Sequence, residues 1–220
     1  CHEDSISEAH QVSQNHEADE NVIPAILPHG SYTVSPENLT DAKRIADEYG
    51  ILFCTHAAET KAEQNDIKTR YNNSVIRHLN EHKLLGENVV LAHCVHLDEK
   101  EISLLAKSKT NVVLNPMSNL KLGSGIAPVK EMKRAGINLT IGTDGAISGN
   151  DLDMWLAMRL TCGLAKGFNM EADALTAEQV LHMATINGAK ALGKSESIGS
   201  LEIGKCADII MVDVNNSHSI

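Results

Sequence analysis

Short apolar runs alternate with longer amphipathic stretches along most of the chain. Each run is too short to form a helix of its own, which predicts a buried strand. The five runs lie at residues 22–28, 51–54, 89–92, 112–114 and 139–142. The stretches between them carry apolar residues at helical spacing and predict helices.

Several of these helices have recognisable ends. Ser35 is a good N-cap, Pro36 is favoured at the first helical position, and Gly50 is typical of a helix end. Asp98 and Glu101 have the spacing of a capping box, which predicts a helix from there to about residue 107. Further helices are expected over residues 61–85 and 127–135.

Every apolar run ends at a residue that can bind a metal, a proton or a substrate. These residues are His29, His56, His93, Asn115 and Asp144, at intervals of 27, 37, 22 and 29 residues. Such an interval fits a strand, a helix and two loops, the βα repeat of a parallel sheet. Both the (β/α)8 barrel and the doubly wound sheet bind ligands at this end of the strands. A polar residue after every strand favours the barrel.

Glu59 follows His56 by three positions. An imidazole can ligate a divalent metal, and a nearby carboxylate can move protons to and from a metal-bound water. A single histidine after a strand is more often a hydrogen-bonded core residue than a ligand. The repetition of the pattern at the ends of other strands favours a site.

Composition excludes some partners. The 220 residues are 42% hydrophobic, enough for one sizeable core, and the net charge is −10 without a Lys/Arg cluster. Nucleic acid is therefore not expected as a partner. A membrane is not expected either, because no apolar run approaches the length of a membrane span. The five cysteines lack C-x-x-C spacing and are expected to be reduced thiols in a cytoplasmic protein. Residues 1–21 are polar and acidic, unlike a signal peptide, and are expected to form an exposed helical segment.

Several motifs, in the same order, resemble those of the amidohydrolase superfamily. The segments similar to strands five to eight are His56-Ala-Ala-Glu59, Ala92-His93-Cys-Val-His96, Asn115-Pro-Met-Ser-Asn119 and Gly142-Thr-Asp144-Gly145. Residues 28–35, 121–128, 150–155, 199–205 and 207–213 also match. The branch that the chain most resembles is that of the 5-methylthioadenosine/S-adenosylhomocysteine deaminases, beside guanine deaminases and s-triazine hydrolases.

The resemblance implies an α/β fold with strands four to eight of a metal-dependent (β/α)8 TIM barrel over residues 22–198. Residues 199–220 are then expected to begin the return to a small β-sandwich domain. One departure is that the family's His-x-His pair after strand one is missing here. The chain is therefore expected to be a C-terminal fragment without strands one to three, which leaves two open sheet edges.

The resemblance also implies roles for the residues at the strand ends. His56 and Asp144 are expected as metal ligands, with two histidines from the missing strands, in a site for one divalent zinc or alternatively iron. Asp144 and Glu59 are expected to transfer protons and to contact the substrate, Glu59 at the ring nitrogen beside the attacked carbon. His93 is expected to hydrogen-bond the attacking water, or to be a ligand in a two-metal site. His29 is expected to bind substrate, with strand capping as the alternative.

Other polar residues are expected to have structural roles. His96 is expected to orient its loop, and Asn115 and Ser118 to fix the loop after strand seven. Gly142 and Gly145 flank Asp144, where a turn with close backbone approach accounts for them. The histidines expected at the surface of helices are His78, His82 and His182.

Three functions are consistent with these residues. The first is an aminohydrolase that removes the exocyclic amine of an adenosine-type nucleoside such as 5-methylthioadenosine or S-adenosylhomocysteine. The second is a guanine, pterin or s-triazine hydrolase of the same superfamily, because pocket loops decide the substrate. The third is a chain that is inactive by itself, because it lacks the His-x-His ligands. A small purine nucleoside or related heterocycle is the expected partner, and homo-oligomers remain open.

Overall fold

Within residues 22–213, five parallel strands form one sheet, in which each strand pairs with its neighbours along the sequence. The strands are β1 (Ala25–Ile26), β2 (Leu52–Ala57), β3 (Val89–His93), β4 (Asn111–Leu114) and β5 (Leu139–Ile141). The computed structural model describes residues 22–213, so the helix expected over residues 1–21 lies outside the described residues. All five predicted strands are confirmed.

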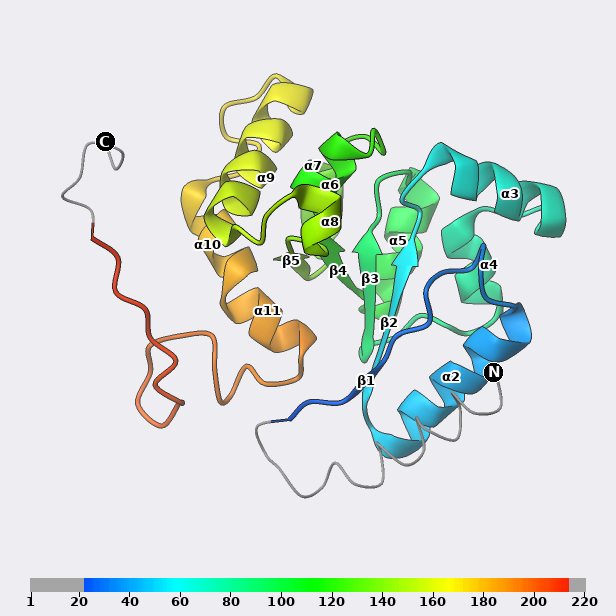
Figure 1. Ribbon diagram of the computed structural model, residues 1–220, viewed down its shortest axis with the longest axis horizontal. Helices are drawn as coiled ribbons and strands as arrows, with labels where there is room; N and C mark the ends of the chain where they lie inside the picture. Colours follow the sequence, from blue (N-terminus) through cyan, green and yellow to red (C-terminus); the bar gives the residue numbers. More distant parts are fainter. Residues whose placement is uncertain (1–21, 214–220) are drawn as a thin grey trace.

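Helices connect the strands and cover the sheet (Figure 1). Between strands these are α2 (Pro36–Tyr49), α3 (Lys61–Tyr71), α4 (Val75–Glu81), α5 (Glu99–Ser108), α6 (Pro116–Lys121) and α7 (Val129–Arg134). After β5 follow α8 (Ala146–Gly149), α9 (Met154–Asn169), α10 (Ala177–Ala184) and α11 (Ile186–Ala191). Parallel strands that alternate with helices confirm the expected α/β class.

The predicted helix ends agree with the structure. The Ser35 side chain accepts a backbone N–H bond, Pro36 opens α2, and Gly50 closes it with a φ of 64°. Asp98 and Glu101 form both halves of the capping box at the start of α5. Short-range side-chain chemistry therefore sets these ends without help from distant parts of the chain.

Two predicted elements differ in extent. β1 spans only Ala25–Ile26, because Pro24 and Pro28 beside it have no backbone N–H for sheet pairing. The helix expected over residues 61–85 is divided into α3 and α4, because Asn72 ends α3 with a left-handed φ of 53°, which asparagine tolerates. Neither difference changes the order of strands and helices.

His78 is buried, and the surface position expected for it is wrong. Its relative exposure on α4 is 1%, and its ring stacks on Tyr71 with 4.4 Å between the centroids. The reason is that α4 packs against both α3 and α5, which cover this face of the helix. His82 is half-buried and His182 is exposed, so only His182 fully fits the expectation.

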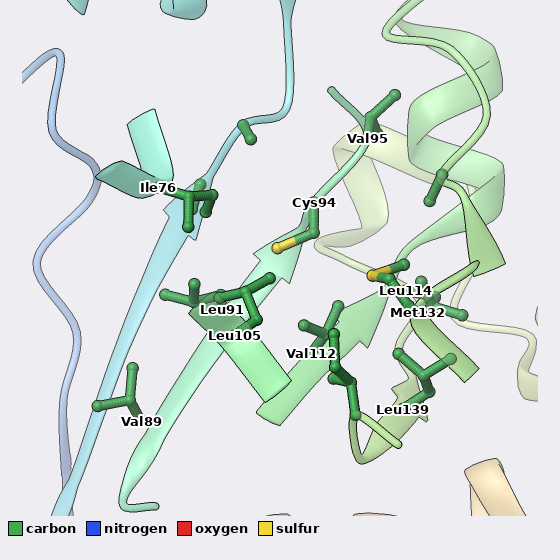
Figure 2. Close-up of a cluster of buried hydrophobic side chains, with 14 of the residues drawn as sticks. Ile76, Val89, Leu91, Cys94, Val95, Leu105, Val112, Leu114, Met132 and Leu139 are labelled. Carbon is green, nitrogen blue, oxygen red and sulfur yellow. The ribbon is translucent and has the colours of Figure 1, made fainter. Parts of the chain in front are cut away.

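The hydrophobic core lies between the sheet and the helices that cover one of its faces. Figure 2 shows Leu91, Val112 and Leu139 of three neighbouring strands beside Leu105 of α5 and Met132 of α7. Each of these side chains is almost completely buried. Burial of apolar area on this scale is the main force that holds the strands in one sheet.

The opposite face of the sheet is less covered. In β2 the side chains of Phe53 and Thr55 are buried, whereas Cys54 and His56 are half-buried. The same alternation of buried and half-buried positions continues in β3. Because side chains of a strand point alternately to its two faces, His56 projects from the face opposite the core helices.

The described cysteines are free thiols, as expected: Cys54, Cys94, Cys162 and Cys206. Burial raises the pKa of the Cys54 thiol to about 11. Burial also raises the pKa of Cys94, which is inaccessible to solvent. Both thiols are therefore neutral at physiological pH and act as small apolar residues.

Residues 199–213 contain neither helix nor strand, and they run away from the sheet (Figure 1). The return to a β-sandwich domain after residue 198 therefore stays a prediction. Within residues 22–213, no helix combines the length and the apolar composition needed to cross a membrane.

Gly142 provides a test of the packing beside the strand ends. A Cβ atom at this position would lie 2.6 Å from Oδ1 of Asn115 and 2.8 Å from Cγ1 of Val113. We expect Gly142→Ala to lower the free energy of unfolding by about 1–3 kcal/mol, because the close-packed neighbours must move. Urea denaturation measures the change.

Gly163 of α9 is the matched control. It is exposed, and no atom lies within 4 Å of the Cβ that an alanine would add. Gly163→Ala should raise stability by up to about 1 kcal/mol, because alanine favours the helix more than glycine does. Equal stability changes in the two variants would contradict the close approach at Gly142.

Candidate active site

Polar side chains from several strand ends meet at one edge of the sheet. The ring centroids of His56 and His93 are 5.4 Å apart, and those of His29 and His56 are 5.0 Å apart. Nε2 of His93 lies 3.9 Å from Oε2 of Glu59 and 3.9 Å from Oδ2 of Asp144. The structure thus brings together the five residues that the sequence analysis proposed for the site, which are His29, His56, Glu59, His93 and Asp144.

The imidazole of His56 has a defined tautomer. Its Nδ1 lies 2.6 Å from the backbone oxygen of His29. Since a carbonyl oxygen only accepts hydrogen bonds, Nδ1 carries the hydrogen and Nε2 keeps its lone pair. A hydrogen bond of this kind orients a histidine that ligates a metal, so His56 fits the role of ligand.

His93 stands between two carboxylates. Its Nδ1 donates to Oδ1 of Asn119 on α6 at 2.8 Å, and both groups are buried. This bond leaves Nε2 directed at Glu59 and Asp144. Nε2 of His93 therefore faces both carboxylates. Asn119 is a contact that the sequence did not single out.

The backbone at His93 is strained. His93 and Cys94 have φ values of 75° and 48°, in the left-handed region that such residues rarely adopt. The conformation is held by hydrogen bonds from the N–H of Cys94 to the oxygen of Ala57 and from the N–H of Val95 to the oxygen of Ala58. The strain turns the chain sharply after β3, at a candidate site residue, and strained residues often lie at functional sites.

Asp144 is held as a carboxylate. Oδ2 accepts a hydrogen bond of 2.7 Å from the Ser118 hydroxyl, and Oδ1 accepts one of 2.7 Å from the N–H of Gly145. Burial pushes the pKa of Asp144 upward, but these bonds and the nearby His93 and His56 outweigh it and hold the pKa below its ordinary value. An ionised carboxylate is the form that ligates a divalent metal.

Ser118 fixes Asp144 through a direct hydrogen bond. It is fully buried on α6, a short helix that follows β4 and opens at Pro116. Ser118 was expected to fix the loop after its strand, and in the structure its hydroxyl holds the Asp144 carboxylate, which follows β5. The pairing could not be predicted from the sequence, because the two residues lie 26 positions apart.

Glu59 is anchored through its main chain by Glu63. Oε2 of Glu63 accepts a hydrogen bond of 2.7 Å from the N–H of Glu59, and the N–H of Glu63 donates to the Thr60 hydroxyl. The Glu63 side chain is buried, and burial raises its pKa to about 7, although hydrogen bonds from backbone N–H groups lower it. The nearby Glu59 carboxylate raises this pKa further. Glu63 was not among the residues nominated from the sequence.

His29 lies at the rim of this group. It is exposed, its Nδ1 lies 2.8 Å from the hydroxyl of Thr33, and its ring meets that of Tyr32 edge-on at 5.3 Å. The backbone oxygen of His29 is also the acceptor for His56. The backbone of His29 therefore orients the ring of His56, and the ring of His29 is exposed to solvent.

His56 and Asp144 supply two donors that suit zinc, an imidazole nitrogen and a carboxylate oxygen. Within residues 22–213, no three His, Cys, Asp or Glu side chains converge closely enough to hold a metal ion. The donors present thus fit part of a zinc site, and the assignment of His56 and Asp144 as ligands stays a prediction.

Comparison with known proteins identifies relatives. The model of the amidohydrolase family matches residues 1–220. The 5-methylthioadenosine/S-adenosylhomocysteine deaminase of Moorella thermoacetica is 47% identical over 208 residues, which cover 94% of this chain and 49% of the relative. The 5'-deoxyadenosine deaminase of Methanopyrus kandleri is 41% identical over 212 residues, 96% of this chain and 49% of the relative.

A solved structure agrees with these relatives. An adenosine deaminase from Xanthomonas campestris with bound zinc superposes with a TM-score of 0.94 at 37% identity. The match covers 97% of this chain and 48% of that one. The chain therefore spans about half the length of the proteins that it matches.

Glu63 makes stability depend on pH. In the fold its carboxyl keeps a proton up to about pH 7, whereas the ordinary pKa is 4.5. The folded state binds more protons between these values, so the stability due to this group falls as the pH rises through that window. The difference corresponds to on the order of 3 kcal/mol.

Glu63→Gln should flatten this dependence, because the amide has no proton to lose and still offers an oxygen to the N–H of Glu59. The melting temperature of the purified protein, measured from pH 5 to pH 8, should fall less in the variant than in the wild type. Glu99→Gln, which changes an exposed carboxyl on α5, should keep the wild-type slope. Parallel curves for Glu63→Gln and wild type would show that this carboxyl is not the cause.

Proposed function

Because the chain belongs to the amidohydrolase family, we propose that the full-length protein is a metal-dependent aminohydrolase that acts on an adenosine-type nucleoside. The observation that carries the proposal is the convergence of Glu59 and Asp144 on Nε2 of His93, beside a His56 ring whose Nε2 is available. Two carboxylates around one imidazole provide the proton transfers that deamination needs.

We further propose that β1 to β5 are strands four to eight of a (β/α)8 barrel. The parallel order of the sheet and the superposition on the zinc-containing adenosine deaminase support this assignment. Residues 22–198 then form the barrel part, and residues 199–220 begin the return to a β-sandwich domain. The open edges at β1 and β5 pair with strands from the other half of the protein.

His56 and Asp144 would hold one divalent metal, zinc or alternatively iron, together with ligands from outside this chain. The lone pair left on Nε2 of His56 and the low pKa of Asp144 support this role. When bound, such a metal is a Lewis acid that makes a nucleophile from water near neutral pH. In an alternative two-metal site, His93 would also be a ligand.

The residues of this chain account for the proton transfers. In deamination a bond forms between the attacked ring carbon and the oxygen of water, the bond to the exocyclic nitrogen breaks, and ammonia leaves. Asp144 takes a proton from the attacking water, which His93 orients by a hydrogen bond, and passes it to the exocyclic nitrogen, which leaves as ammonia. Glu59 gives a proton to the ring nitrogen beside the attacked carbon and so stabilises the charge that the attack creates. Glu59 recovers a proton from the new hydroxyl group, which becomes the carbonyl of the product.

The proposed substrate is 5-methylthioadenosine or S-adenosylhomocysteine, converted to the corresponding inosine analogue. Relatives named for deamination of these nucleosides and of 5'-deoxyadenosine support this class. The exposed ring of His29, beside that of Tyr32, is placed to meet the nucleoside at the rim of the site. The partner is therefore a small molecule.

A substrate panel tests the proposal. Full-length enzyme supplied with zinc is assayed with 5-methylthioadenosine, S-adenosylhomocysteine, 5'-deoxyadenosine, guanine and a chloro-triazine. We expect ammonia release from the adenosine-type nucleosides, with the highest kcat/KM among them. Ammonia release confined to guanine, or chloride release alone, would refute the substrate class and leave the metal site standing.

A set of four variants separates metal ligands from proton carriers. His56→Ala and Asp144→Ala should each lower the bound metal in elemental analysis, because each removes a donor atom. Glu59→Gln should keep the metal and lose turnover by a factor on the order of 10² or more, because general acid–base catalysis is worth that much. His93→Ala should reduce activity more than metal content. Metal loss in His93→Ala equal to that in His56→Ala would favour the two-metal site.

A further inference from the structure

The two oxygens of the Glu59 carboxylate have different surroundings. The hydroxyl of Ser124 donates to Oε1 at a distance of 3.3 Å, from a residue 65 positions away. Oε2 instead faces Nε2 of His93 at 3.9 Å. One oxygen is therefore engaged by a fixed donor, and the other is turned toward the centre of the site.

Ser124 is itself firmly held. It is buried on the loop between α6 and α7, and its N–H donates to the backbone oxygen of Asn119 at 2.8 Å. Nε2 of His96 donates to the backbone oxygen of Ser124 at 2.8 Å. The backbone oxygen of His96 in turn accepts a hydrogen bond of 2.7 Å from Gln64 of α3. The backbone of Ser124 is thus tied to α6, to the loop after β3 and, through that loop, to α3.

The neighbouring glycine shows how closely these loops approach. Gly125 has a φ of 121°, and a Cβ atom there would lie 3.1 Å from Cγ1 of Val95. The loop of Ser124 therefore packs against the turn that carries His96. Because the backbone of Ser124 is held in this way, the residue has little freedom to follow the Glu59 carboxylate if that group rotates. The Ser124 hydroxyl therefore favours one orientation of the carboxylate.

We propose that Ser124 is a positioning residue for Glu59, and that His96 holds Ser124 in place. A hydrogen bond to Oε1 favours negative charge on that oxygen, so the mobile proton resides on Oε2, the oxygen directed toward the substrate. The assignment rests on the proton-transfer role proposed for Glu59. It also explains His96, whose side chain fixes a neighbouring loop instead of touching the reacting groups.

A double-mutant cycle in the full-length zinc enzyme tests the proposal. Ser124→Ala should lower kcat roughly 10-fold or more, the effect of losing a hydrogen bond to a charged group, with KM and metal content nearly unchanged. Ser124→Thr keeps the hydroxyl and should restore most of kcat. In a Glu59→Gln background, Ser124→Ala should cause little further loss, because Ser124 acts through Glu59.

An equal fold-loss from Ser124→Ala in the wild-type and Glu59→Gln backgrounds would overturn the proposal. So would a Ser124→Thr variant as impaired as Ser124→Ala. Ser103→Ala, at an exposed serine of α5, is the control for loss of a hydroxyl and should leave kcat unchanged. His96→Phe should reproduce the effect of Ser124→Ala, because it releases the loop.

The test stays separate from the choice of substrate. The cycle is run on whichever member of the panel the wild-type enzyme converts, so a wrong nucleoside assignment does not affect it. Crystal structures of the wild type, Ser124→Ala and Ser124→Thr show the orientation of the Glu59 carboxylate and do not depend on catalytic activity. The Glu59 carboxylate should rotate only in Ser124→Ala, and an unmoved carboxylate in that variant would also overturn the proposal.

Discussion

The parallel pairing of β2 with β3 is the constraint on which the site depends. Its register places Ala57 opposite His93, and hydrogen bonds from the turn after β3 to Ala57 and Ala58 continue the pairing beyond the strands. His56, Glu59 and His93 therefore reach the same edge of the sheet. A shift of one residue would turn His56 to the core face and separate it from His93, because side chains alternate along a strand.

This geometry has a conformational cost. Ala58, His93, Cys94 and Asp144 all have positive φ values without being glycine, and each such residue costs on the order of 1–3 kcal/mol. Buried side chains and backbone hydrogen bonds around the turns offset the cost. The strained residues are those that redirect the chain at the strand ends, where His93 and Asp144 must face each other.

Carboxyl groups of the site differ in protonation because their surroundings differ. Asp144 receives hydrogen bonds from Ser118 and Gly145 and is held ionised, whereas burial favours the neutral form of Glu63. Glu59 has a donor on one oxygen, and the other oxygen faces His93. The proposed deamination needs one acid as an ionised metal ligand and another as a proton carrier, and the donors to Asp144 support the first of these roles.

The sequence by itself determined the strands, the capped ends of α2 and α5, and the five residues gathered at the sheet edge, because apolar runs, N-caps and strand-end positions are local features. It did not reveal the break at Asn72, the burial of His78, or the contacts of Ser118, Asn119 and Ser124. The contacts of Ser118, Asn119 and Ser124 join residues 26 to 65 positions apart, which only the packed sheet brings together. The left-handed backbone at His93 was likewise hidden, because no glycine marks it and tertiary hydrogen bonds impose it.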